Sequence, residues 1–286
     1  MTPNDSLQRF VFENAAVRGE FIHLEQSVQE ILTQHNYPPA IKKLLAEFLC
    51  VAGLLTAIIK FDGRLTVQFR GEGNLKLIIA QCDHHFQLRG LVKFKQDSNY
   101  DELLLEMKKG LLAIMVDSSS TKRYQGIVNW EGFSIAESIE NYFKQSEQLT
   151  TKLYLNVSDQ SAAGLLLQAM PTASAPEMEN LEWYRLMSFM DGFDPKSLLT
   201  ANREDMLKDL FPSDEIRIFP PQPIKFQCTC SRQRSEQAIL ILGREEAEAE
   251  LQDNQVISVT CDFCNAEYTF DRDAIEILFN SDQNSR

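Results

Sequence analysis

The pattern of apolar and polar positions divides the chain into three regions. Residues 1–174 contain one long apolar stretch and several short ones. Residues 175–225 begin within the small-residue segment 172–176 and carry one amphipathic stripe. Residues 226–286 combine short amphipathic runs with four of the six cysteines. We therefore expect an α+β protein with a large N-terminal domain that contains a sheet, a helical linker and a small C-terminal domain.

The first region combines a long helical pattern with several strand patterns. Residues 38–59 begin with Pro38-Pro39 and carry a wide apolar face, which predicts a buried helix. Ser134 and Glu137 form a capping-box pattern that predicts a helix to about residue 145. Short apolar or alternating runs separated by glycines predict an antiparallel sheet. Its candidate strands are 65–69, 75–79, 86–94, 111–116, 153–157 and 164–169.

The second region carries an amphipathic helix with a methionine-rich face. Its apolar side chains recur at i, i+3, i+4 and i+7, and they are Trp183, Leu186, Met187 and Met190. Gly192 fits the end of this helix, and shorter helical segments are expected at 195–199 and 203–210. Methionine side chains suit reversible apolar contacts. We interpret this face as one that docks on the first domain and, when released, binds other proteins.

The third region holds two closely spaced cysteine pairs. Cys228 and Cys230 are separated by one residue, and Cys261 and Cys264 by two. Two such pairs can bring four thiolates to a single tetrahedral ion, so we predict one zinc site with four cysteine ligands. This site has no open position for a substrate, which argues against a zinc hydrolase. Zinc contributes about 10–16 kcal/mol to small modules of this kind, so its loss is expected to unfold the region.

The rest of this region has a simple helix and strand pattern. Residues 231–242 and 274–279 predict helices, with Gly243 ending the first, and residues 256–260 predict a strand that leads into Cys261. The acidic run 245–250 predicts a solvated helix face. Residues 256–270 thus favour a strand, a knuckle and a second strand.

The thiols leave several functions open. Zinc holds all four sulfurs as reactive thiolates, so oxidation could eject the ion. A disulfide between Cys228 and Cys230 is only just within reach and would be strained and easily reduced. The alternatives are a structural zinc-ribbon module on another kind of protein, a nucleic-acid-binding zinc ribbon and a thiol oxidoreductase. An oxidoreductase would place Cys261 and Cys264 at the start of a helix beside a βαβ unit, which the pattern does not favour.

Charge and composition exclude further classes. The formal net charge is −13, and residues 226–286 hold five Lys or Arg against twelve Asp or Glu. This acidity opposes nucleic-acid binding, which requires clustered positive charges. No apolar run is long enough to span a bilayer and no signal peptide is evident, so we expect a soluble cytoplasmic protein without membrane contact. Cys50 and Cys82 lie in apolar runs as small core residues, and His84-His85 predict an exposed turn.

At these residues the chain closely resembles the bacterial heat-shock protein 33 family of redox-regulated chaperones. The resemblance covers nearly the whole chain and includes the Cys-x-Cys and Cys-x-x-Cys layout with Ser231-Arg232 after the first pair. Asn265 stands where family members often have glycine, and asparagine tolerates the left-handed conformation that a knuckle requires. The other matching segments are 61–65, 126–128, Glu131-Gly132, 134–143, 145–148 and 163–168.

The resemblance implies an ATP-independent holdase without enzymatic activity. Zinc would be bound by the four cysteines under reducing conditions, when activity is low. Oxidation with heat would form the disulfides Cys228–Cys230 and Cys261–Cys264, release zinc, and unfold the zinc domain and linker. Apolar surface on the first domain and the linker would then bind unfolded client proteins, and the oxidised protein would form a homodimer.

Overall fold

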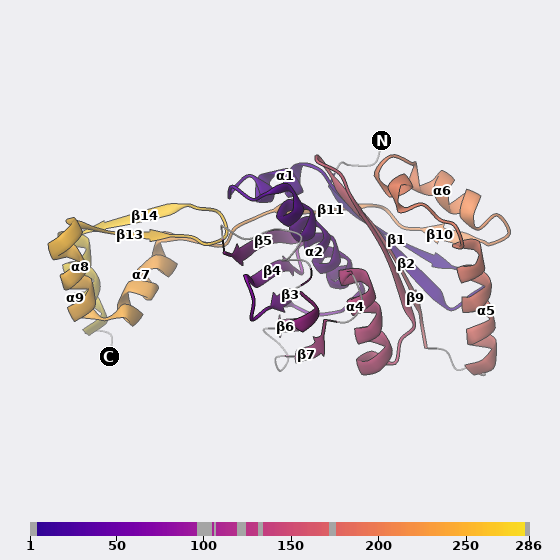
Figure 1. Cartoon of the computed structure of the whole chain (residues 1–286), viewed down its shortest axis with the longest axis horizontal. Helices are drawn as coiled ribbons and strands as arrows, with labels where there is room; N and C mark the ends of the chain where they lie inside the picture. The colour runs from indigo at the N-terminus through magenta and orange to yellow at the C-terminus, as the bar shows by residue number, and fades with distance from the viewer. Residues whose placement is uncertain are drawn as a thin grey trace. The chain divides into compact units, whose positions relative to one another are not determined.

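The computed structural model describes residues 5–95, 105, 107–118, 124–130, 134–171 and 176–283. Glu131-Gly132, the segment 172–175 and the side chain of Met178 lie outside this description. The chain forms two compact units, Met1–Gln227 and Cys228–Arg286 (Figure 1).

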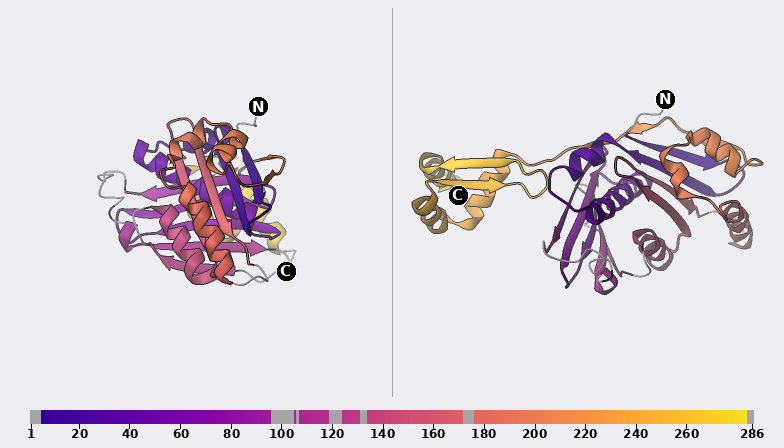
Figure 2. Two further views of the ribbon diagram at one scale, coloured as in Figure 1. Left: turned by 90° about the vertical axis from the view of Figure 1, so that its right-hand side faces the viewer. Right: turned by 45° about the horizontal axis from the view of Figure 1, so that its top comes forward.

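A long helix, α2 (Pro39–Ile58), lies at the centre of the first unit and confirms the helix predicted there. Pro39 stands in the first turn, where its missing N–H removes no helical hydrogen bond. Leu45, Leu49 and most other side chains of α2 are buried. Lys42, Lys43 and Glu47 stand in its first half. From Phe48 on, the helix is largely apolar on all sides because it lies between two sheets and contacts strands of both (Figures 1 and 2).

Two sheets, each with six described strands, enclose α2. In sheet A the order is β10-β1-β2-β9-β8, and β11 also pairs with β1. In sheet B the order is β12-β5-β4-β3-β6-β7. Sheet A consists of β1 (Ser6–Phe12), β2 (Val17–Leu24), β8 (Thr151–Val157), β9 (Ala162–Ala169), β10 (Ile216–Ile218) and β11 (Gln222–Pro223). Sheet B consists of β3 (Gly63–Arg70), β4 (Leu75–Asp83), β5 (Gln87–Phe94), β6 (Leu111–Ser118), β7 (Tyr124–Asn129) and β12 (Lys225–Phe226).

Six of these twelve strands, β3 to β6, β8 and β9, were predicted from the sequence. Strand β7, the short strands β10 to β12, and the longer pair β1 and β2 were missed. The missed pair carries charges on the side that faces α2. Arg9 on β1 and Glu20 on β2 form an ion pair with an Nε–Oε1 distance of 2.7 Å, and the Glu20 side chain is only 2% exposed. Charged residues at such positions break the apolar alternation that marks a strand.

Short helices contribute further side chains to the core around α2. They are α1 (Gln26–Leu32), η1 (Met107–Lys109), α4 (Ile135–Tyr142) and the π-turn η2 (Phe143–Glu147). Ser134 caps α4, because its side chain accepts a hydrogen bond from the Glu137 backbone N–H at 3.2 Å. The predicted helix start at Ser134 is thereby confirmed.

A layer of helices covers the face of sheet A that points away from α2 (Figures 1 and 2). It consists of α5 (Pro176–Phe189), η3 (Pro195–Leu199) and α6 (Arg203–Leu210). Together with the sheet, this layer forms a second apolar core, separate from the one around α2. We call α5, η3 and α6 the outer layer. Its buried apolar side chains are Trp183, Leu186, Met190, Leu198, Met206 and Leu207.

The second unit is small. It contains α7 (Arg232–Leu242), α8 (Arg244–Asn254), the hairpin β13 (Val256–Thr260) and β14 (Glu267–Asp271), and α9 (Arg272–Gln283). Its described core comprises Ile239, Ala247, Leu251, Ile257, Phe270, Ile275 and Phe279. The predicted strand–knuckle–strand is the β13–β14 hairpin. No helix in the described parts of the chain is long and apolar enough to cross a membrane.

The position of α2 predicts a large effect of core truncation. Leu49→Ala should lower the free energy of unfolding of the first unit by about 2–5 kcal/mol, because the packed sheets cannot close the cavity. Both tryptophans, Trp130 and Trp183, lie in this unit, so urea denaturation followed by tryptophan fluorescence measures it. Lys43→Ala, at an exposed position of the same helix, is the matched control. Equal losses in the two variants would contradict the central role of α2.

Candidate metal centre

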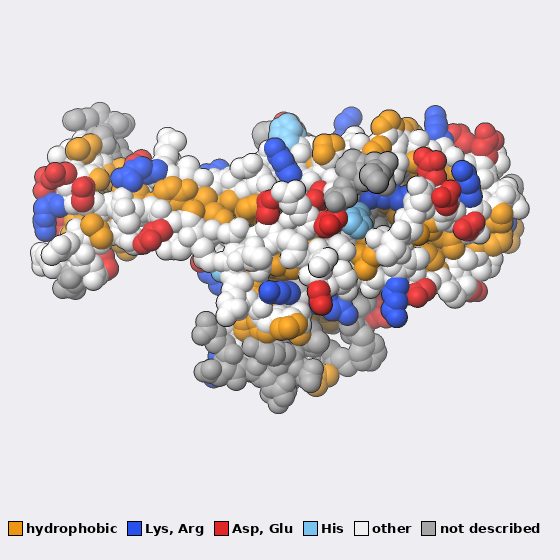
Figure 3. All heavy atoms as spheres, turned by 90° about the horizontal axis from the view of Figure 1, so that it is seen from above, with side chains coloured by type: hydrophobic (Ala, Val, Ile, Leu, Met, Phe, Trp, Pro, Cys, Tyr) orange, Lys and Arg blue, Asp and Glu red, His pale blue; other side chains and the backbone are white. Residues whose placement is uncertain are grey.

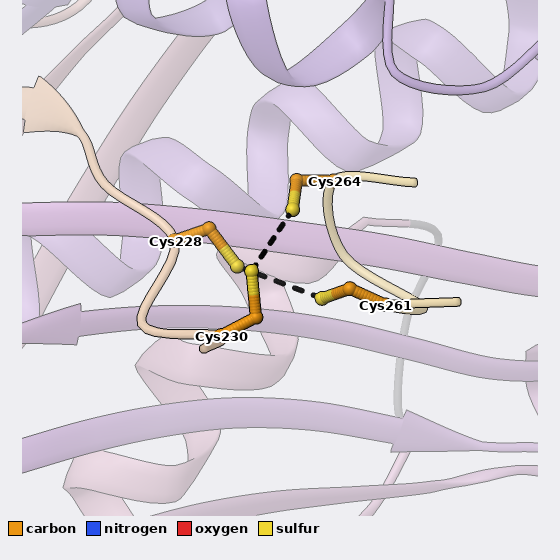
Figure 4. Close-up of side chains that lie close together, drawn as sticks. All are labelled: Cys228, Cys230, Cys261 and Cys264. Atoms are coloured by element: carbon orange, nitrogen blue, oxygen red, sulfur yellow. Dashed lines mark hydrogen bonds between the residues drawn. The ribbon is translucent and has the colours of Figure 1, made fainter. Parts of the chain in front are cut away.

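The structure brings the four predicted cysteines together in the second unit. Cys228 and Cys230 lie just before α7, and Cys261 and Cys264 lie in the loop between β13 and β14 (Figure 4). All four sulfur atoms lie within 4.8 Å of one another. Two contacts join the two loops, with 3.6 Å between the sulfurs of Cys228 and Cys261 and 3.4 Å between those of Cys230 and Cys264.

These distances fit a tetrahedral metal ion. Four sulfurs placed at about 2.3 Å from one ion are about 3.8 Å apart, close to the contacts between the loops. The bond of a disulfide is much shorter, about 2.05 Å, and all six cysteines of the chain are free thiols. Four soft sulfur donors around one point could therefore hold a thiolate-binding metal ion with no ligand position left open.

The hairpin loop is shaped to present its two thiols. The Cys261 N–H donates to the Ala266 carbonyl and the Asn265 N–H donates to the Cys261 carbonyl, each at 2.9 Å. Asn265 adopts a left-handed conformation with φ of 53°. The sequence expectation for this knuckle is thereby confirmed, since asparagine is among the few residues that accept this backbone geometry.

The first pair is held against the hairpin by the start of α7. Ser231 caps this helix by accepting a hydrogen bond from the Arg234 N–H at 3.3 Å. Arg232 donates to the Thr269 carbonyl at 3.0 Å, and its guanidinium lies 4.2 Å from the centre of the Phe270 ring. These contacts keep the segment with Cys228 and Cys230 facing the loop of Cys261 and Cys264.

Burial and the neighbouring thiols affect the protonation of Cys264. Burial raises the pKa of the Cys264 thiol above its usual range; a hydrogen bond from the Ala266 backbone opposes this shift, and the neighbouring thiols add to it. A metal ion would remove this penalty, because it stabilises the deprotonated sulfurs that coordinate it.

Tyr268 is the residue of this site that the sequence did not reveal. It lies on β14, and its hydroxyl donates a hydrogen bond to the Cys230 sulfur at 3.3 Å. This hydrogen bond, with burial as a second cause, raises the pKa of Tyr268 to about 12, so the hydroxyl remains a donor at neutral pH. Tyr268 follows Cys261 by seven residues, and nothing in this spacing indicates that its side chain contacts Cys230 of the first pair.

The other two cysteines and the histidine pair play no part in the cluster. Cys50 and Cys82 are fully buried, which raises the pKa of Cys82 to about 12 and that of Cys50 further. Their prediction as core residues is confirmed. His84 and His85 form the exposed turn that the sequence predicted.

The predicted client-binding residues are held in the outer layer. Trp183 is 7% exposed, Leu186 is 0% and Met190 is 4%, and Met187 packs against them at the edge of the same core. Their partners on sheet A are aromatic and aliphatic side chains that the sequence did not single out. These are Phe10, Phe12, Val17, Phe21, Ala163, Leu165 and Leu167.

A polar cluster lies within this apolar contact. Arg203 at the start of α6 donates to Gln8 Oε1 at 3.2 Å and to Ser6 Oγ at 3.1 Å, and its guanidinium lies 5.9 Å from the Phe21 ring centre. Among the described residues, no carboxylate forms an ion pair with Arg203. Burial lowers the pKa of Arg203 to about 10, which means that its charged form loses solvation without gaining a counter-charge.

The geometry predicts how a spectroscopic metal probe will bind. Metal-free reduced protein should bind one Co²⁺ with the absorption of a tetrahedral thiolate complex. Cys264→Ser should weaken this absorption and lower the affinity, because one of four sulfur donors is lost. Cys50→Ala, which removes a buried thiol outside the cluster, is the control and should leave the spectrum unchanged. A six-coordinate oxygen-type spectrum in the wild-type protein would contradict the four-sulfur site.

Comparison with known proteins relates nearly the whole chain to one family. The family described as Hsp33 protein matches residues 5–271. The 33 kDa chaperonin of Pseudomonas aeruginosa strain PAO1 is 39% identical over 284 residues, which cover 98% of this chain and 96% of that protein. That of Sodalis glossinidius is 41% identical over 285 residues, covering 97% and 96%. The crystal structure of the 33 kDa chaperonin of Thermotoga maritima, a heat shock protein 33 homolog, shares the fold with a TM-score of 0.83 at 21% identity, covering 99% of this chain and 100% of that one. The chain therefore belongs to the Hsp33 family.

Proposed function

We propose that this protein is a redox-regulated chaperone that holds unfolding proteins without ATP and without enzymatic turnover. The observation that carries the proposal is the four-thiol cluster, which lies in a unit with a small core of its own. The names of the relatives, 33 kDa chaperonin, support the chaperone role. The apolar contact beneath the outer layer supplies a surface that a chaperone could use.

In the reduced state, Cys228, Cys230, Cys261 and Cys264 bind one Zn²⁺. When bound, the ion supplies a closed four-thiolate crosslink that joins the segment before α7 to the β13–β14 loop. A domain of this size has at most a few kcal/mol of stability from its own core, whereas zinc on thiolates contributes about 10–16 kcal/mol. The second unit is therefore folded only while the metal is held.

Oxidation removes the ligands. Two thiolates transfer two electrons to one molecule of hydrogen peroxide, which yields one disulfide and two hydroxide ions. The disulfides Cys228–Cys230 and Cys261–Cys264 use up all four donors, so the zinc ion leaves and the second unit unfolds. The outer layer is joined to the second unit through β10, β11 and β12, which pair with β1 and β5 of the first unit. Unfolding of the second unit then has to extend into these short strands before the outer layer separates from sheet A.

Separation of the outer layer exposes two complementary apolar faces. One consists of Trp183, Leu186, Met187 and Met190 on α5, and the other is the aromatic face of sheet A beneath them. Unfolded segments of client proteins bind to these faces, because they also expose apolar side chains. The same exposure allows two oxidised chains to form a homodimer.

We place this activity in the cytoplasm, where thiols are kept reduced until oxidants arrive. Nucleic acids and membranes are not among the proposed partners. The net charge of −13 agrees with this, as does the face in Figure 3, on which acidic and basic side chains are interspersed and form no basic tract. Binding to polyanions requires a cluster of positive charges.

The central test measures zinc content and aggregation suppression on one preparation of the full-length protein. Before oxidation, we expect about one bound zinc per chain and little suppression of the aggregation of a heat-unfolded client. After hydrogen peroxide at elevated temperature, we expect loss of zinc together with strong suppression. Zinc retained under oxidation, or released without a gain in suppression, would leave a structural zinc module and contradict the switch. Catalytic turnover of a model disulfide would favour a thiol oxidoreductase instead.

A second prediction tests the outer layer apart from the redox chemistry. Leu186→Asp places a charge in the contact between α5 and sheet A and should detach the helix. We expect the reduced, zinc-loaded variant to suppress client aggregation at least several-fold better than the reduced wild-type protein. Tyr184→Asp is the matched control, because Tyr184 lies on the same helix and is 69% exposed. Wild-type behaviour of both variants would exclude this face as the client-binding surface.

A further inference from the structure

A tyrosine side chain joins the two halves of the cysteine cluster through one sulfur. Tyr268 donates from β14 to the sulfur of Cys230, which precedes α7, so the hydrogen bond links residues 38 positions apart. In the hairpin, Tyr268 lies opposite Val259, next to the strand ends that carry the second cysteine pair. The hydroxyl therefore contacts the cysteine pair that its own hairpin does not contain.

The backbone around Tyr268 is fixed in this position from both sides. Tyr268 and Phe270 are two residues apart on β14, so they point to the same face of the hairpin. Phe270 is buried in the core of the unit and lies under the guanidinium of Arg232. Arg232 also donates to the carbonyl of Thr269. Arg232 is two residues from Cys230. The contacts of Arg232 with Thr269 and Phe270 therefore hold the start of α7 against β14 and place the Tyr268 hydroxyl at the Cys230 sulfur.

A hydrogen bond to a metal-bound thiolate weakens that sulfur as a nucleophile and as a reductant. The donor draws on the same sulfur electron pair that would attack an oxidant, and hydrogen bonds to ligand sulfurs are among the factors that set the reduction potentials of metal–thiolate centres. A thiolate that loses such a donor reacts faster without any change in its ligand geometry.

We propose that Tyr268 is a positioning residue that lowers the reactivity of Cys230 toward peroxides and thereby sets how much oxidant the cluster tolerates. The inference rests on the redox function proposed above. In the first step a thiolate attacks one oxygen of the peroxide, the O–O bond breaks, and a sulfenic acid and hydroxide form. In the second step another thiolate displaces hydroxide from the sulfenic acid to form the disulfide. In either role, the hydrogen bond from Tyr268 draws electron density from the Cys230 sulfur and slows its attack.

Tyr268→Phe tests this in the full-length, zinc-loaded protein, because it removes the hydroxyl and keeps the ring. At a fixed peroxide concentration, zinc release followed with a chelating dye should be about three- to tenfold faster than in the wild-type protein, the range expected for loss of one hydrogen bond. Brief alkylation with iodoacetamide and peptide mass mapping should show the gain concentrated at Cys230. Tyr184→Phe makes the same chemical change at an exposed site outside the cluster and should match the wild-type protein.

The site of alkylation separates electronic tuning from simple loosening. If Tyr268 only supported the fold, its loss would raise the alkylation of Cys228, Cys261 and Cys264 as much as that of Cys230, and this result would overturn the proposal. Equal zinc-release rates in the variant and the wild-type protein would also overturn it. The proposed redox switch would survive either result, whereas a wild-type protein that keeps its zinc under peroxide would refute the switch itself.

A second probe covers the case in which Tyr268→Phe does not retain zinc. Wild-type protein in which all seven tyrosines are replaced by 3-fluorotyrosine keeps every ring and hydroxyl, but its hydroxyls are stronger hydrogen-bond donors. The effect should be the reverse, with slower alkylation of Cys230 and slower zinc release. Unchanged Cys230 alkylation in the fluorinated protein would overturn the role of Tyr268.

Discussion

Sheet A has two apolar faces, and this constraint shapes the rest of the first unit. A sheet in water can leave one polar face exposed, but a sheet that is apolar on both sides must be covered twice. The inner face, with Leu7, Ile22 and Leu24, packs on α2 within the main core. The outer face, with Phe10 and Phe21, is covered by the outer layer and by Phe211, which directly follows α6. Whatever detaches that layer exposes an aromatic surface.

Helix α2 and the outer layer pack on the two faces of sheet A through different kinds of contact. The contact with α2 comes from a helix whose buried side chains are almost all apolar and pack into the core between both sheets. The outer contact includes the guanidinium of Arg203, which is hydrogen-bonded to neutral partners and has no carboxylate among the described residues. Taking a charge out of water without a counter-charge reduces the free energy gained on docking. Arg185 partly offsets this, since it binds Asp214 with distances of 2.6 and 3.0 Å and ties α5 to the turn after α6. The docking of the outer layer thus combines an apolar contact with the desolvation cost of one buried charge.

The sequence predicted those features that depend on local pattern. The long apolar run identified α2, the alternating runs identified β3 to β6, the Ser134 cap was correct, and the spacing of the cysteines predicted that all four come together. Strands β1 and β2 were missed because the ion pair of Arg9 and Glu20 occupies positions that face α2. Tyr268 could not be found, because its partner is fixed by the pairing of the hairpin with the start of α7. Features that arise from contacts between distant segments leave little trace in local sequence.

In the redox function proposed above, the pairing of the sulfurs would decide whether oxidation stabilises the folded second unit or allows it to unfold. Two sulfur contacts join the two loops across 33 and 34 residues. Disulfides formed along these contacts would close long loops and stabilise the folded unit by about 3–4 kcal/mol each in the chain-entropy description, which would replace the metal with a permanent crosslink. Disulfides within Cys228–Cys230 and within Cys261–Cys264 close only very short loops and leave the two segments unconnected. If oxidation unfolds this unit, as we propose, the disulfides must therefore form within each loop. All four sulfurs lie within 4.8 Å of one another, so both kinds of pairing are within reach, and the outcome depends on which thiolate attacks the oxidised sulfur.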